Sequence, residues 1–217
     1  MKKNYTEIIF ILDKSGSMNK MFSDVVGGVD SFIQSQKADK DDTRMTMVQF
    51  NNKAQAIYTS KPVAELSGFY SKDYHPSGGT ALLDAIGNTI RDMKRYFESM
   101  NEDERPENVV LVIQTDGMEN SSRTYNKDHI TKMIKEQEEQ GWKVIYLGAN
   151  SDAFNDNNSI GLSGRMQMNY AGSSNTDAFN ATSEAIKSIK NKTFSYEDSM
   201  NAYLENEKGR RNRGEGL

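Results

Sequence analysis

Three short apolar runs restrict the folds that are open to this chain of 217 residues. They are IIFIL at 8–12, VVLVI at 109–113 and VIYLG at 144–148. Each run is apolar at consecutive rather than alternate positions, which is typical of strands covered on both faces, as in a parallel sheet. We therefore expect these runs to form buried strands of such a sheet.

Helical periodicity fills the intervals between the runs. Apolar residues recur three and four positions apart in the segments 22–33, 82–97, 130–134 and 178–189. Strands that alternate with helices predict a doubly wound α/β domain, with a mostly parallel sheet and helices on both of its faces. A short strand is expected at 165–170, before the last helix. The pair Gly27–Gly28 lies inside the first helical segment and indicates close helix packing.

One segment has a different pattern. Residues 44–60 read as two strand-like halves on either side of the polar stretch NNKA. This pattern predicts a hairpin that turns at Asn51–Asn52. The hairpin would add one antiparallel strand at the edge of the sheet, which is common on otherwise parallel sheets.

Composition and length limit the possible classes of function. The net charge of −4 argues against a chain built to hold a polyanion, and the absence of cysteine excludes disulfides and thiolate metal ligands. The run at 8–12 is too short for a signal peptide, and no apolar stretch is long enough to span a membrane. We expect a cytoplasmic protein in which residues 1–191 form one domain. Residues 192–217 would form a polar C-terminal extension, with a short helix and a flexible tail.

The first apolar run ends in a cluster of oxygen-bearing side chains, in LDKSGSM at 12–18. Residues two apart in an extended chain point to the same side, so Asp13, Ser15 and Ser17 can converge where the strand ends. Open α/β sheets place their ligand sites at this carboxyl edge. Oxygen-only ligands suit a hard divalent cation such as Mg²⁺.

Two further segments supply residues of the same kind. Thr80 follows two glycines at the start of a helical segment, and Asp116 follows the end of the second apolar run. With Asp13, Ser15 and Ser17 they would provide two carboxylates and three hydroxyls, enough to hold one octahedral ion through direct and water-mediated bonds.

The order Asp-x-Ser-x-Ser, then a distant Thr, then a distant Asp resembles the metal-ion-dependent adhesion site (MIDAS) of von Willebrand factor A-type (vWA) domains. The contexts DKSGSM, GGTAL and TDG are similar to those of bacterial and phage members, over about residues 5–190. The resemblance implies that Asp13, Ser15, Ser17, Thr80 and Asp116 hold one Mg²⁺, Mn²⁺ or Ca²⁺ ion. Met18, Asn19 and Lys20 stand where integrin-type members carry acidic residues of an adjacent ion site, so we expect no second site there.

The resemblance also implies a function, which is a non-enzymatic module for binding other proteins. A partner protein would supply an Asp or Glu to the ion, and an AAA+ ATPase is one class of partner for bacterial members of this size. Two alternatives remain open at this point. One is a metal-dependent phosphohydrolase, for which only His75 could serve as an acid or base. The other is a nucleic-acid binder acting through the basic tail GRRNRG at 209–214.

Plainer structural roles are also possible for the same residues. Asp13 and Ser15 could cap a helix that begins near Asn19, and Thr80 could cap its own helix. Asp84 lies one turn after Thr80. It could be an ordinary polar residue in the first turn of that helix, or it could accept a hydrogen bond from one of the metal ligands.

Overall fold

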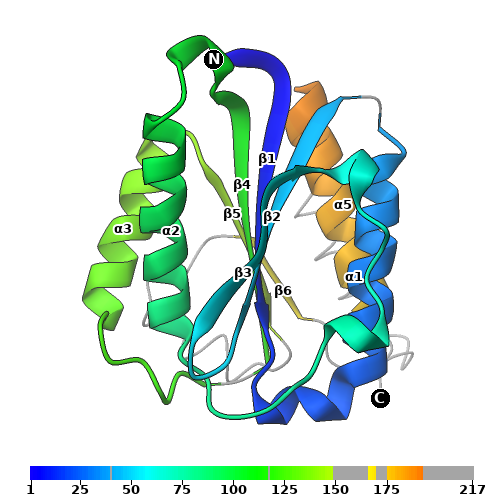
Figure 1. Ribbon diagram of the computed structural model, residues 1–217, viewed down its shortest axis with the longest axis vertical. Helices are drawn as coiled ribbons and strands as arrows, with labels where there is room; N and C mark the ends of the chain where they lie inside the picture. Colours follow the sequence, from blue (N-terminus) through cyan, green and yellow to red (C-terminus); the bar gives the residue numbers. More distant parts are fainter. Residues whose placement is uncertain (40, 117, 149–165, 170–174, 193–217) are drawn as a thin grey trace, which may run out of the picture.

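The computed structural model describes residues 1–39, 41–116, 118–148, 166–169 and 175–192. It contains a six-stranded sheet in the order β3-β2-β1-β4-β5-β6. The strands are β1 (Lys2–Asp13), β2 (Asp42–Phe50), β3 (Ala54–Pro62), β4 (Pro106–Thr115), β5 (Lys143–Gly148) and β6 (Met166–Asn169). The main helices are α1 (Phe22–Lys37), α2 (Leu82–Glu98), α3 (Lys127–Glu139) and α5 (Asn175–Asn191). Figure 1 shows α1 and α5 on one face of the sheet and α2 and α3 on the other.

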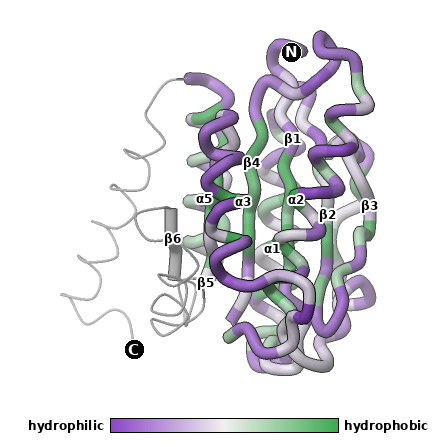
Figure 2. Tube along the Cα trace, turned by 90° about the vertical axis from the view of Figure 1, so that its left-hand side faces the viewer, coloured by the Kyte–Doolittle hydropathy of each residue, from purple (hydrophilic) through white to green (hydrophobic). Residues whose placement is uncertain are grey.

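The centre of the sheet is the parallel pair β1 and β4, with Ile9 opposite Leu111 and Leu12 opposite Gln114. Successive residues of β1 point to opposite faces, so Phe10 packs in the core beneath α1 and α5 while Ile9 packs in the core beneath α2 and α3. Figure 2 shows hydrophobic colours on the strands and hydrophilic stretches along the helices. The predicted doubly wound α/β fold is confirmed.

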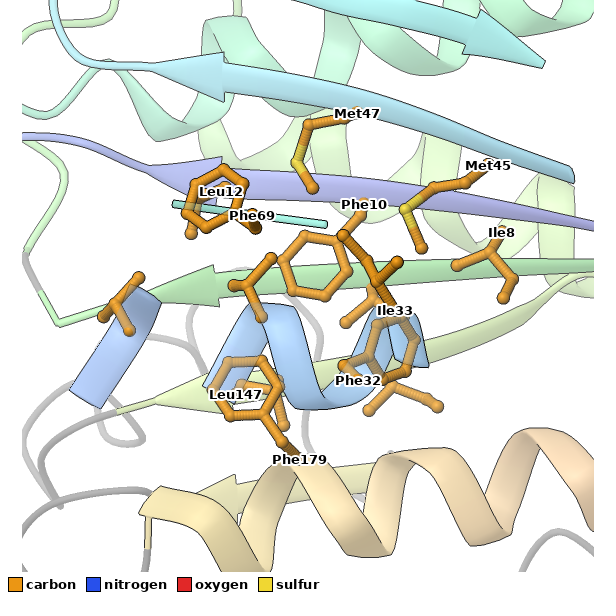
Figure 3. Close-up of a cluster of buried hydrophobic side chains, with 14 of the residues drawn as sticks. Ile8, Phe10, Leu12, Phe32, Ile33, Met45, Met47, Phe69, Leu147 and Phe179 are labelled. Atoms are coloured by element: carbon orange, nitrogen blue, oxygen red, sulfur yellow. The ribbon is translucent and has the colours of Figure 1, made fainter. Parts of the chain in front are cut away.

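Aromatic rings fill the core beneath α1 and α5 (Figure 3). The ring of Phe10 lies 5.5 Å from that of Phe32 on α1 and 6.4 Å from that of Phe179 on α5, measured between centroids. The backbone of Gly28 lies directly against Phe179, where a Cβ would overlap the ring. Gly27, by contrast, has open space at its Cβ position, so only one of the two glycines provides the predicted close packing.

The predicted hairpin is confirmed. Strands β2 and β3 pair antiparallel, and β3 is the edge strand of the sheet. The register shifts between Met45 and Met47, where Thr59 and Ser60 of β3 face the single residue Thr46. Ser60 has a positive φ of 46° at this bulge, and its side chain turns inward to a buried polar cluster.

That polar cluster surrounds Glu7. Strand β1 begins at Lys2, well before its apolar run, so Glu7 lies inside the strand and is covered by its neighbours. Glu7 is fully buried and accepts hydrogen bonds from Tyr5 (2.8 Å), Thr46 (2.7 Å) and Ser60 (2.8 Å). Burial raises the pKa of the Glu7 carboxyl, and the three hydroxyl donors only partly oppose this effect. A charged carboxylate at this position therefore costs free energy of folding near neutral pH.

The substitution Glu7→Gln tests this cost. A raised pKa in the folded state means that the stability from Glu7 is greatest below its ordinary pKa of 4.5 and is lost as pH rises through the folded-state value. The free energy of unfolding of Glu7→Gln should therefore increase relative to that of the wild type as pH increases from 4.5 to 8. Urea denaturation at several pH values measures this difference. The exposed control Glu98→Gln should show a flat difference, and a flat difference for Glu7→Gln would contradict the prediction.

The described chain reaches one residue beyond α5. Residues 193–217, which include nearly all of the predicted C-terminal extension and its basic tail, lie outside the described residues. The domain boundary at 191–192 therefore stays a prediction. No helix within the described parts of the chain combines the length and the apolar character needed to cross a membrane.

Candidate metal centre

Three of the five predicted ligands share a chain of hydrogen bonds at the carboxyl edge of the sheet. β1 ends at Asp13, and a 3-10 helix, Gly16–Met21, begins two residues after Lys14. The hydroxyls of Ser15 and Ser17 lie 3.1 Å apart, and the Ser17 hydroxyl donates to Asp116 Oδ1 at 2.7 Å. The ends of β1 and β4 thus bring together residues that are 99 positions apart in the chain.

Asp13 lies directly behind this chain and is fully buried. Its Oδ1 accepts the backbone N–H of Ser15 at 2.6 Å, and its Oδ2 accepts the hydroxyl of Thr115 at 2.5 Å. Burial raises the pKa of the Asp13 carboxyl to about 6, against the lowering effect of these two donors, and the neighbouring Asp116 raises it further. Burial also raises the pKa of Asp116. Both carboxylates would therefore be stabilised in their charged form by a cation.

Thr80 lies on a loop that is fastened to the first one. The N–H of Ser77 donates to the carbonyl of Lys14 at 2.8 Å, and the N–H of Gly16 donates to the carbonyl of Gly78 at 3.0 Å. Thr80 is buried, and within the described part of the chain its hydroxyl makes no direct hydrogen bond to the other four predicted ligands. The structure thus joins four of the predicted ligands closely and places the fifth on the adjoining loop.

The donor set fits a hard divalent cation. Every side chain of the set offers oxygen, and two buried or half-buried carboxylates provide negative charge. Among the described residues no cluster of three or more His, Cys, Asp or Glu side chains forms a metal site. A cation at this edge would therefore be held by hydroxyls and two carboxylates rather than by a carboxylate cage.

The capping roles considered for these residues are not observed. Ser15 occupies the N-cap position of the 3-10 helix, but its side chain caps no backbone N–H there. Thr80 is not the N-cap of α2, because that helix begins at Leu82 with Ala81 as its N-cap. The sequence pattern predicted the start of α2 to within two residues, but it assigned the N-cap to Thr80 instead of Ala81.

A distant loop supplies the missing caps of α2. Glu119 Oε2 accepts the N–H of Leu83 at 2.9 Å, and the Ser122 hydroxyl accepts the N–H of Asp84 at 3.0 Å. The amide oxygen of Asn120 likewise accepts the N–H of Thr80 at 2.9 Å. Sequence reasoning missed these residues, although the polar stretch ENSS at 119–122 is a signal for local side-chain to backbone bonding.

Asp84, in the first turn of α2, also binds the loop after β4. Its carboxylate accepts the backbone N–H groups of Arg123, Thr124 and Tyr125, each at 2.9 Å. These hydrogen bonds lower the pKa of Asp84 despite some burial. The loop after β4 and the start of α2 are therefore one rigid unit beside the predicted ligands.

A family model for the von Willebrand factor type A domain matches residues 7–192. The chain belongs to this family. A search of curated protein sequences gives no match. Domains of the vWA family generally mediate metal-dependent protein interactions, and those with a MIDAS bind a divalent cation.

Solved vWA structures agree with the fold. The vWF domain of the type V pili tip protein Mfa5 from Porphyromonas gingivalis has a TM-score of 0.62 at 9% identity, covering 84% of this chain and 95% of that one. BatB from Bacteroides thetaiotaomicron has a TM-score of 0.57 at 18% identity, covering 87% and 100%. The proximal thread matrix protein 1 from the mussel byssus, solved with a zinc-occupied MIDAS motif, has a TM-score of 0.53 at 16% identity, covering 88% and 46%. This chain spans about half the length of the byssus protein.

Proposed function

We propose that this vWA domain is a metal-dependent module for binding another protein. Asp13, Ser15, Ser17, Thr80 and Asp116 would hold one divalent cation, with Mg²⁺ as the first choice and Mn²⁺ or Ca²⁺ as alternatives. The observation that carries the proposal is the hydrogen-bonded chain Ser15–Ser17–Asp116 beside the buried carboxylate of Asp13. The cation would supply an open coordination position for an Asp or Glu of the partner.

The hydrogen bonds orient the side chains for this role. Because Ser17 donates its only hydroxyl proton to Asp116, it accepts the Ser15 hydroxyl with one lone pair, and its other lone pair is left to face a cation. The hydroxyl of Thr115 and the N–H of Ser15 each donate to one oxygen of Asp13 and fix that carboxylate, which forms no salt bridge among the described residues. Neutral hydroxyl ligands leave a bound cation electron-poor, which favours an anionic group from the partner.

The partner is defined here by its chemistry, as a protein that presents an acidic side chain. An AAA+ ATPase is one candidate class, drawn from the resemblance to bacterial vWA proteins. The enzyme alternative has less support, because His75 is exposed and, within the described residues, makes no hydrogen bond to the predicted ligands. vWA domains in adhesins and matrix proteins are typically non-enzymatic.

Affinity capture in two buffers tests the proposal. The immobilised wild-type domain should retain a specific protein in Mg²⁺ and release it in EDTA, because the partner's carboxylate would bind through the ion. Asp116→Ala should retain nothing in either buffer, since it removes one of the two charged ligands. The variant Asp92→Ala, which changes an exposed carboxylate on α2, is the matched control and should behave as the wild type.

Capture that is the same in Mg²⁺ and EDTA would contradict the proposal. Release of phosphate from p-nitrophenyl phosphate, dependent on Mg²⁺ and lost in Asp116→Ala, would favour the phosphohydrolase instead.

A further inference from the structure

A polar hollow of about 410 Å³ adjoins the loop that carries Thr80. Its wall is formed by the turn of the β2–β3 hairpin, the start of α2 and the loop after β4. Gly79, the residue before Thr80, lies against three side chains of this wall, since a Cβ built on this glycine would lie 2.2 Å from Ser121 Oγ and 3.0 Å from both Asn52 Nδ2 and Asn120 Oδ1. The hollow therefore begins one residue away from a proposed metal ligand.

Two cationic side chains line this hollow, Lys53 from the hairpin and Arg123 from the loop after β4. Both are exposed, and across the described ranges neither takes part in a salt bridge. Asp84 is the one carboxylate among the lining residues, and its oxygens are already bound by three backbone N–H groups. The lining residues thus carry two positive charges and one negative charge, and the carboxylate of Glu119, which accepts hydrogen bonds from Ser121 and Ser122, lies behind them.

The polar groups of the lining offer a ligand the donors of Lys53, Arg123 and the Asn52 amide nitrogen, together with the lone pairs of two serine hydroxyls. The hydroxyls of Ser121 and Ser122 donate to Asn120 and Glu119, so their protons are engaged within the loop. The amide oxygen of Asn52 accepts the N–H of Gly79 at 3.0 Å, which leaves the amide nitrogen of Asn52 as a donor.

The walls of the hollow are held in place before any ligand binds. On the hairpin side, the N–H of Ala81 donates to the carbonyl of Asn51 at 2.8 Å, and Asn51 Nδ2 donates to the carbonyl of Ser77 at 2.9 Å. On the other side, Asp84 and Glu119 bind the loop backbone. A site that is fixed in advance loses little conformational entropy on binding.

We propose that this hollow, the Lys53–Arg123 subsite, binds a second carboxylate of the partner protein. The inference rests on the proposed function: the partner presents two acidic side chains, one to the cation and one to Lys53 and Arg123. It narrows the partner class to proteins whose docking segment carries a pair of Asp or Glu residues at a fixed separation.

Synthetic peptides test the subsite without knowledge of the natural partner. The probes are N-acetylated, C-amidated peptides with two Asp residues separated by one to four glycines, and matched peptides in which Asn replaces the second Asp. Binding to the full chain is followed by NMR titration in Mg²⁺ and in EDTA. At the best spacing the second carboxylate should tighten binding in Mg²⁺ by roughly fivefold, as expected for partly exposed ion pairs.

The gain should disappear in the double variant Lys53→Met with Arg123→Gln. The matched control, Lys3→Met with Arg95→Gln, changes the same two residue types at the opposite end of the sheet and should keep the gain. Raising the salt concentration should also reduce the gain, because exposed charges are screened.

Each remaining outcome overturns a defined part of the scheme. If the single-Asp peptides bind only in Mg²⁺ and the second Asp adds nothing at any spacing, the subsite is wrong and the proposed function stands. If the gain survives in the double variant, the second carboxylate binds elsewhere. If no peptide shows dependence on Mg²⁺, the proposed function fails and the subsite with it. A phosphoserine that binds more than tenfold tighter than the second Asp would replace the carboxylate assignment with a phosphate one.

Discussion

Millimolar Mg²⁺ should raise the melting temperature of the wild-type protein by several degrees and leave that of Asp13→Asn unchanged. A ligand at about 100 times its dissociation constant stabilises the folded state by about 2.7 kcal/mol. For a chain of this size, each kcal/mol corresponds to about 2–4 °C. Asp13→Asn removes the charge while its side-chain oxygen can still accept the N–H of Ser15, so the local fold is kept. Differential scanning calorimetry with and without Mg²⁺ measures both effects.

The same experiment distinguishes a metal role from a structural one. Without metal, Asp13→Asn should melt at or above the wild-type temperature at pH 7.5, because a buried carboxylate whose pKa is raised to about 6 destabilises the fold there. Ser15→Ala should keep a reduced Mg²⁺ effect, since only one neutral ligand is lost. The exposed control Asp103→Asn should keep the full effect. An unchanged Mg²⁺ effect in Asp13→Asn would remove this residue from the proposed site.

The two adjacent glycines of α1 should respond in opposite directions to alanine. Gly28→Ala places a methyl group against the Phe179 ring, which the rings of Phe10 and Phe32 hold in place, so overpacking of about 1–3 kcal/mol exceeds the gain in helix propensity. Gly27→Ala adds a methyl group in open space and should stabilise the helix by about 0.5–1 kcal/mol. Thermal denaturation followed by circular dichroism should show a lower melting temperature for the first variant and a higher one for the second.

A second substitution locates the cause of the Gly28→Ala effect. Phe179→Leu frees space beside residue 28, so the cost of Gly28→Ala should be smaller in the Phe179→Leu background than in the wild type. Equal stability of Gly27→Ala and Gly28→Ala would show that α1 and α5 do not pack as closely as the structure indicates.

Much of the fold is predictable because its signals are local. The apolar runs identified β1, β4 and β5, and the pattern around Asn51 identified the hairpin and its antiparallel edge strand. The glycine pair indicated close packing, but only the three-dimensional arrangement shows that Gly28 provides it. The apolar run at 8–12 predicts a strand from Ile8 onward, whereas β1 begins at Lys2 and buries Glu7 within it.

In the candidate site, too, the residues with local sequence signals could be predicted and the long-range contacts could not. Asp13, Ser15 and Ser17 could be named from their spacing at a strand end, and the structure brings them near Asp116. The caps of α2 could not be predicted, because Glu119 and Ser122 lie 36 and 38 residues from the groups that they bind. Periodicity describes neighbours along the chain, while these contacts depend on which loops meet at the edge of the sheet.

The central pairing of β1 with β4 also determines when the site can form as the chain is synthesised. Asp13 and Thr115, which meet across this pair, are 102 residues apart. At about 5–20 residues per second, a ribosome would add Thr115 roughly 5–20 s after Asp13. During that interval the nascent chain can pair β1 with the β2–β3 hairpin on one side only, and its other edge stays open. A cation held by the full set of proposed ligands could then bind only after Asp116 has been added, so metal supply would act after β1 and the β2–β3 hairpin have been synthesised and not on the first steps of folding.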